Sequence, residues 1–171
     1  TSAQAPHDMD GLNHLVQSAI TLAQIATPSP HNVLPGDTIA TSEEVSENKK
    51  NLDLWDKTAA TLDTQWAIQN SMQMERILGQ TSGIQSSQDV MAASSCHSFG
   101  LASTNGFVGT TSGTHTSLSA SAVVEDGQGK KQVDGWWSAG RHQNGLDDAA
   151  DVSARAAERV LARIGAKKIP S

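Results

Sequence analysis

The sequence contains few of the features on which several protein classes depend. Its 171 residues include one cysteine, Cys96, so the chain cannot form an internal disulfide. A disulfide-stapled secreted scaffold is therefore excluded. The 12 basic residues are outnumbered by 18 acidic ones, for a formal charge of -6. This balance gives no electrostatic reason to expect nucleic acid or an anionic membrane as a partner.

Long apolar segments and common site motifs are also missing. No apolar run approaches the roughly 20 residues that cross a bilayer, and the start, TSAQAPHDMD, lacks the pattern of a signal peptide. No two of the six histidines have the i, i+4 spacing that lets one helix offer two zinc ligands. The sequence also lacks a phosphate-binding loop. It therefore predicts a chain without a membrane span and without a metal or cofactor of its own, and it is compatible with a cytosolic location.

Three segments have the spacing of helices. Apolar residues at 11–26 recur at steps of three and four, with Asp10 before them and Pro28 after them. Residues 57–78 contain neither Gly nor Pro and are rich in helix formers. The segment 146–164 has a regular apolar face, acidic residues at its start and basic residues near its end. A polar loop over 29–53 separates the first two helices.

The region between the second and third helices is rich in Ser, Thr and Gly, and two interpretations are open. Such text is found in flexible linkers, but small polar and apolar residues alternate here as they do in half-buried strands. The second interpretation predicts strands over about 95–103, 115–125 and 131–139, with turns at Asn105-Gly106 and DGQGK. The order of elements then predicts an α+β fold in one partial domain over 1–171, with an antiparallel or mixed sheet covered by helices.

The end of the last predicted strand carries the candidate contact residues. Trp136 and Trp137 are consecutive, so one side chain should enter the core while the other faces the opposite side. The outward tryptophan either packs under a helix or belongs to an interface. Arg141 and His142 either hold a carboxylate or peptide carbonyl, or lie in a solvated loop.

Ser95, Cys96 and His97 are a second candidate group, for an independent hydrolase. No G-x-S-x-G elbow surrounds them, and no base can be identified for them in the sequence. Neighbours on a strand point to opposite faces, so Cys96 and His97 are not expected to bind one metal together.

Several short motifs follow one another in an order typical of one family. They are LASTNGF (101–107), SLSASAVVEDG (117–127), DGWWSAGRH (134–142) and ARAAERVLARIGAKKIPS (154–171), preceded by LAQIATPSPHNVLPG and NLDLWD. This succession resembles the TldD/PmbA family, also called modulator of DNA gyrase. The paired aromatics after the hairpin resemble the PmbA (TldE) branch in particular.

The resemblance implies the latter part of the N-terminal domain of a two-domain protein. In this family a TldD-type subunit binds zinc through a His-Glu-x-x-x-His helix and cleaves unfolded peptides, and a PmbA-type subunit is its partner in a cytoplasmic dimer. His-Glu-x-x-x-His does not occur in this sequence, so no catalytic or metal-binding residue carries over. Zinc is expected only in a TldD-type partner. The chain begins at Thr1 rather than Met, which suggests an excerpt or a truncated product that starts after the family's first strands.

We therefore expect a non-catalytic portion of a TldD/PmbA-type metalloprotease that handles unfolded peptides as a homo- or heterodimer. The candidate interface or peptide contacts are Trp136, Trp137, Arg141 and His142. A stand-alone peptide- or protein-binding adaptor without protease activity is the alternative. A sheet that lacks its first strands has an unpaired edge, which also predicts dimerisation or strand exchange.

Overall fold

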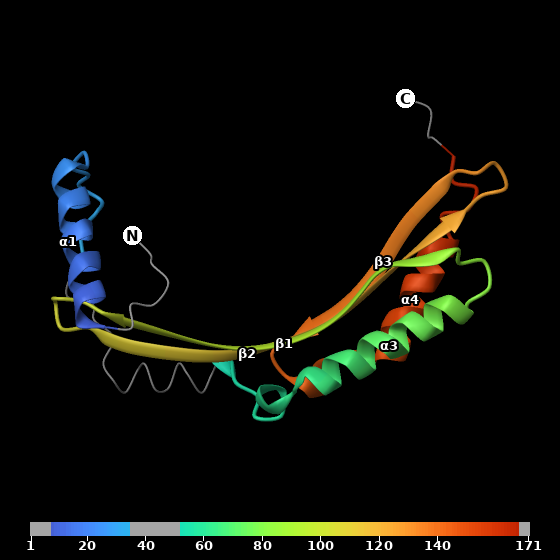
Figure 1. Ribbon diagram of the computed structural model, residues 1–171, viewed down its shortest axis with the longest axis horizontal. Coiled ribbons are helices and arrows are strands. Elements are labelled where there is room, and N and C mark those ends of the chain that lie inside the picture. Colours follow the sequence, from blue (N-terminus) through green and yellow to red (C-terminus); the bar gives the residue numbers. More distant parts are fainter. Residues whose placement is uncertain (1–7, 35–51, 168–171) are drawn as a thin grey trace. The chain divides into compact units, whose positions relative to one another are not determined.

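The computed structural model describes residues 8–34 and 52–167. The chain divides into two compact units, Thr1–Ile39 and Ala40–Ser171, where we had expected one partial domain. The first unit contains helix α1 (Met9–Ile25), and the second contains the sheet and the other elements (Figure 1). Most of the predicted loop, residues 35–51, lies outside the described residues. No helix within 8–34 and 52–167 is long and apolar enough to cross a membrane.

Helix α1 starts slightly earlier than expected because a different aspartate caps it. The side chain of Asp8 accepts a 2.7 Å hydrogen bond from the Gly11 N–H, whereas Asp10 lies in the first turn. The helix ends at Ile25, and Ala26 is already extended ahead of Pro28. No residue of α1 is buried, so its apolar stripe is a surface of the first unit.

The second unit is built on an antiparallel sheet with strand order β1-β2-β3. Strands β1 (Ser86–Ala102) and β2 (Val108–Glu125) form a long hairpin, and β3 (Lys131–Gly140) pairs with the Thr116–Glu125 part of β2. Gly106 and Gly129 have φ angles of 91° and 77° in the two connecting turns, a conformation that glycine adopts without a Cβ penalty. The linker interpretation of this region is therefore wrong, and the strand interpretation is confirmed.

The first two strands are longer than the sequence predicted. β1 begins at Ser86 instead of about residue 95, and β2 begins at Val108 instead of about 115. The register shifts between Ser87 and Asp89. Such a bulge interrupts the alternation of polar and apolar residues from which a strand is predicted. The early part of β2 contains two glycines, which weaken the same signal, yet it pairs continuously with β1.

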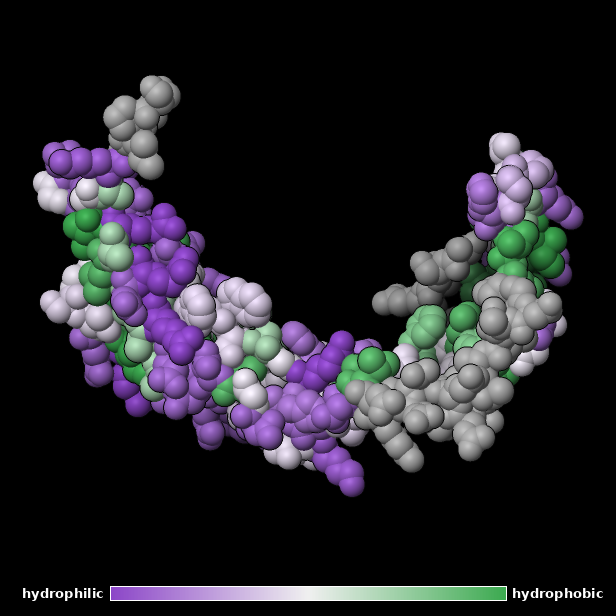
Figure 2. All heavy atoms as spheres, turned by 180° about the vertical axis from the view of Figure 1, so that it is seen from behind, coloured by the Kyte–Doolittle hydropathy of each residue, from purple (hydrophilic) through white to green (hydrophobic). Residues whose placement is uncertain are grey.

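Helices α3 (Thr64–Gln80) and α4 (Ala149–Leu161) cover one face of the sheet, on the half that includes β3 (Figure 1). The core between them consists of alternate residues of β2 and the inward faces of the helices; its members include Leu118, Ala120, Ala122, Val124, Met74, Leu78, Val152, Ala156 and Val160. In Figure 2, hydrophilic residues dominate the visible surface of this half of the second unit. The predicted α+β fold, with helices covering an antiparallel sheet, is confirmed.

Both core helices start later than predicted, because aspartates cap them. Asp63 accepts a hydrogen bond from the Trp66 N–H, so α3 begins at Thr64, and the preceding residues form a turn and the short 3-10 helix η1 (Ala59–Thr61). Asp148 accepts from the Asp151 N–H, so α4 begins at Ala149 instead of 146. An aspartate at a helix start satisfies a backbone N–H that has no partner within the helix.

Candidate functional site

The two tryptophans of β3 lie on opposite faces of the sheet, as the strand period requires. Trp136 packs against the core, and the guanidinium groups of Arg155 and Arg159 lie 5.4 and 5.5 Å from its ring centroid. The indole N–H of Trp136 is buried and has no hydrogen-bond partner in the described part of the chain. Trp137 lies opposite Ser119 and is 67% exposed. Of the pair, Trp137 is the one that a partner can reach.

Trp137 belongs to a face of the sheet that carries exposed apolar side chains. Met91 and Trp137 are both paired with Ser119 and flank it on the two neighbouring strands. Met91 is 48% exposed, and Val133, which lies on the same strand as Trp137 and opposite Val123, is 49% exposed. These exposed apolar residues surround a row of small serines on one sheet face, which we call the open face.

The other predicted residues lie where β3 ends, beside Thr114 of β2. The Thr114 side chain is fully buried. Its hydroxyl donates to the Arg141 carbonyl at 2.7 Å and accepts from the Asp56 N–H at 3.0 Å. The Thr114 N–H donates to the Leu54 carbonyl at 3.0 Å. One buried threonine therefore joins two segments distant in sequence, 53–58 and 141–144, and we call this arrangement the junction.

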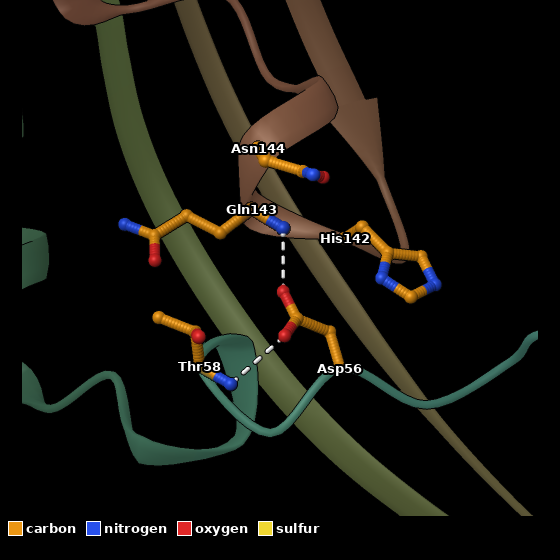
Figure 3. Close-up of a pocket in the computed structure, with 5 residues that line it drawn as sticks. All are labelled: Asp56, Thr58, His142, Gln143 and Asn144. Carbon is orange, nitrogen blue, oxygen red and sulfur yellow. Dashed lines mark hydrogen bonds between the residues drawn. The ribbon is translucent and has the colours of Figure 1, made fainter.

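The Asp56 carboxylate completes the junction. Oδ2 accepts a 2.7 Å hydrogen bond from the Gln143 N–H, and Oδ1 accepts a 2.8 Å bond from the Thr58 N–H (Figure 3). These bonds, the one from Gln143 first, lower the pKa of Asp56, and desolvation opposes them. The group therefore stays ionised at neutral pH.

The imidazole of His142 lies against both the backbone carbonyl and the side-chain carboxylate of Asp53. Its Nε2 lies 2.9 Å from the Asp53 carbonyl oxygen and 3.1 Å from the Asp53 carboxylate. Both atoms are acceptors, so Nε2 carries a proton. The bond to the Asp53 carbonyl is the main cause that raises the pKa of His142; the charges of Asp53 and Asp56 add to it, and desolvation opposes it. Asp53 has a left-handed φ of 45°, which is uncommon outside glycine.

The predicted residues Arg141 and His142 thus have different environments. Arg141 is exposed and fixes the junction through its carbonyl. Its guanidinium lies close to Gly113, where an added Cβ would be 3.3 Å from it. His142 lines a polar pocket of about 390 Å³ with Asp56, Thr58, Gln143 and Asn144 (Figure 3). The pocket therefore offers one ionised carboxylate, an imidazole, two amides and a hydroxyl.

The candidate hydrolase residues do not form a comparable cluster. Ser95, Cys96 and His97 are consecutive on β1, so their side chains alternate between the two faces. Cys96 is exposed, and no hydrogen bond joins these three side chains. Across residues 8–34 and 52–167, no group of three or more His, Cys, Asp or Glu is placed to hold a metal ion.

Sequence reasoning did not assign a role to three residues of the junction. Asp53 and Asp56 lie in NLDLWD, which we had quoted only as part of a family resemblance. The spacing of two aspartates around a tryptophan was the available signal, because Asp commonly starts turns. No sequence pattern distinguished Thr114, since it is one of many threonines in a Ser/Thr-rich strand.

The segment that holds the sheet, both core helices and the junction matches a known protein class. Residues 53–164 match the family model described as the PmbA/TldA metallopeptidase central domain. This match includes more than half of the 171 residues. The chain therefore belongs to the PmbA/TldD family, as its motifs had implied. We had placed this segment in the latter part of an N-terminal domain, whereas the family model describes it as a central domain.

Solved structures have the same fold. A candidate modulator of DNA gyrase from Bacteroides thetaiotaomicron is 22% identical, with a TM-score of 0.80 over 96% of this chain and 36% of its own. A second protein so described, from Thermotoga maritima, is 19% identical, with a TM-score of 0.63 over 69% of this chain and 27% of its own. The chain thus spans about a third of the length of these relatives. No protein with a curated description matches it.

Proposed function

We propose that this chain is a non-catalytic part of a TldD/PmbA-type metalloprotease and provides a scaffold for subunit contact and peptide handling. The match of residues 53–164 to a metallopeptidase central domain carries this proposal. The sequence contains no His-Glu-x-x-x-His, so the proposal assigns the zinc and the cleavage step to a TldD-type partner subunit. The protein acts on unfolded peptides together with that subunit.

The far part of the β1–β2 hairpin supports a role in contact with another polypeptide. β3 stops at Gly140, opposite Thr116, so the hairpin beyond this point has two strands in the described part of the chain. Phe99, Leu101 and Val108 lie there, 60%, 51% and 76% exposed. A two-stranded ribbon is only marginally stable by itself in water. We infer that it forms part of the subunit contact.

The open face offers a second contact surface on the same unit. Trp137 is the largest exposed side chain of β3, and tryptophan is enriched among residues that dominate binding energy. Extended peptides can add to a sheet edge through backbone hydrogen bonds, with alternate side chains in pockets, and β3 is an edge strand of the described sheet. The row Ser117, Ser119 and Ser121 leaves room beside Trp137 for such a segment.

A co-purification experiment tests the proposed function. The tagged chain is used as bait in a lysate that contains a TldD-type subunit, and the eluate is assayed for cleavage of an unfolded peptide with and without a zinc chelator. We expect co-purification and chelator-sensitive cleavage, with neither in an eluate from the tag alone. Binding of peptide without the subunit and without cleavage would contradict the proposal and favour a stand-alone adaptor.

A further inference from the structure

Gly113 of β2 marks a point on the open face where side chains from two other segments meet. The nearest atoms to a Cβ added there would be Cε1 and Nε2 of His97, both at 2.8 Å, followed by Nη1 of Arg141 at 3.3 Å. The imidazole and the guanidinium therefore lie side by side over the glycine, on the face opposite the buried Thr114 side chain. His115, the next residue of β2 on this face, is also exposed.

The Arg141 guanidinium has no counter-ion in the described part of the chain. The ion pairs of that part involve other basic residues. Among the paired residues of the sheet, the nearest acidic residue on the open face is Asp89, which pairs with β2 six positions beyond His115. The open face around Gly113 therefore presents one full positive charge and two imidazoles to solvent. We call Arg141, His97 and His115 the positive centre.

Apolar side chains lie on both sides of the positive centre. Met91 and Trp137 pair with β2 four positions to one side of His115, and Phe99 pairs with β2 four positions to the other side. All three apolar side chains are exposed. Four positions correspond to about 13 Å of extended strand, and residues four apart in an extended segment point to the same side. An extended segment on this face would therefore present its own side chains to the positive centre and to both apolar groups.

We propose that the open face binds an acidic side chain of an extended peptide at Arg141, with His97 and His115 as further hydrogen-bond donors and apolar residues of the peptide on both sides. A guanidinium holds its N–H donors in a planar fork that fits both oxygens of a carboxylate. Under the proposed function, on which this assignment rests, the segment belongs to the unfolded peptide. A free carboxyl end has the same chemistry, but its peptide would reach apolar residues on one side only.

Three synthetic peptides separate these sources when they are titrated into the full chain and followed by NMR at the backbone N–H signals of Gly113 and His115. The first is acetylated and amidated, and it has a central glutamate with leucines four residues before and after it. The second has glutamine in place of glutamate, and the third has this glutamine and a free carboxyl end. We expect the glutamate peptide to bind about tenfold or more tightly than the second peptide, because only its central side chain is charged. The third peptide should bind like the second.

Substitutions then locate the site. Arg141→Gln keeps the backbone carbonyl that Thr114 binds, and it should weaken binding of the glutamate peptide about tenfold. Arg76→Gln is the matched control, because it removes an exposed guanidinium from α3, which covers the other face of the sheet. Gly113→Ala retains every charge but places a methyl group where the His97 ring lies, and it should weaken binding about threefold through the loss of one hydrogen bond. If Gly113→Ala does not fold, Arg141→Gln decides the question.

Two outcomes overturn the inference: no tighter binding of the glutamate peptide than of the glutamine peptide up to millimolar concentrations, or equal effects of Arg141→Gln and Arg76→Gln. If the free carboxyl end binds as tightly as glutamate, the assignment to an acidic side chain is wrong and the site takes peptide carboxyl ends. A chain that co-purifies with a TldD-type subunit but fails this titration would lose the acidic-peptide site and keep the proposed function. A chain that prefers the glutamate peptide but binds no such subunit would keep the site and lose the protease assignment.

Discussion

Asp56 and Gln143 are 87 residues apart in the chain, and the Gln143 backbone N–H donates a 2.7 Å hydrogen bond to the Asp56 carboxylate. This bond and those of Thr114 connect the segment before the first core helix to the loop after β3. The pocket exists because both segments are held at the same place on β2. Changes at the junction should therefore affect the stability of the protein and the geometry of the pocket together.

Thr114→Val should destabilise the protein by about 1 to 3 kcal/mol, because the Arg141 carbonyl and the Asp56 N–H would lose a buried partner. Urea unfolding of the two proteins measures this difference. The matched control is Thr116→Val on the same strand. Thr116 is equally buried, but its hydroxyl lies 3.5 Å from that of Ser94, at the limit of a hydrogen bond. An equal cost for the two substitutions would show that the junction bonds contribute little.

His142 should make stability fall as pH rises through neutrality. The pKa of His142 is raised above its ordinary 6.5 in the folded protein, mainly by the Asp53 carbonyl. The stabilisation is therefore complete below 6.5 and is lost as pH rises through the higher folded-state pKa. Unfolding free energies of the wild type and His142→Gln, measured from about pH 5 to 9, should converge at the alkaline end.

A second variant separates the two contributions of Asp53 to this pH dependence. Asp53→Asn removes the charge but keeps the backbone carbonyl, so it should reduce the pH effect without abolishing it. A pH-independent difference between wild type and His142→Gln would contradict this account.

Gly135→Ala should be costly because β3 approaches β2 closely at this position. An added Cβ would lie 2.6 Å from the Ala120 carbonyl oxygen and 2.8 Å from the Ser121 Cβ. These atoms belong to the paired strand and cannot move freely, so we expect a loss of about 1 to 3 kcal/mol. Gly140→Ala, on the same strand, is the control because its nearest neighbour would be 3.5 Å away. Thermal unfolding of both variants compares them, and a larger effect at Gly140 would be inconsistent with this packing.

Trp136→Ala should lower the stability of the protein, whereas Trp137→Ala should weaken binding to the proposed partner subunit. Trp136 packs on the core and under two arginines, so its removal should cost about 2 kcal/mol or more in unfolding free energy. Trp137 is 67% exposed, so its removal should change stability by less than about 0.5 kcal/mol while it weakens co-purification with the partner subunit. Undiminished co-purification of Trp137→Ala would remove the open face from the proposed interface.

The sequence was sufficient to predict those structural features that depend on interactions between residues close together in the chain. Alternation along β3 placed Trp136 and Trp137 on opposite faces, and the Gly-containing turns at 103–107 and 126–130 were located. Helix starts were less certain, because several aspartates compete for each cap. Asp8, Asp63 and Asp148 act as caps, and only the backbone path shows which aspartate accepts the N–H.

What the sequence by itself determined is thus the fold class, the hairpin order and the family, because caps, turns and strand periods depend on interactions within a few residues. The tertiary structure decided which tryptophan is exposed and which lies against α4. It also decided that Asp53, Asp56 and His142 share one site. Those residues meet because Thr114, 58 positions from Asp56 and 27 from Arg141, binds both segments. No local pattern encodes an approach over such distances; it follows from the length and register of β2.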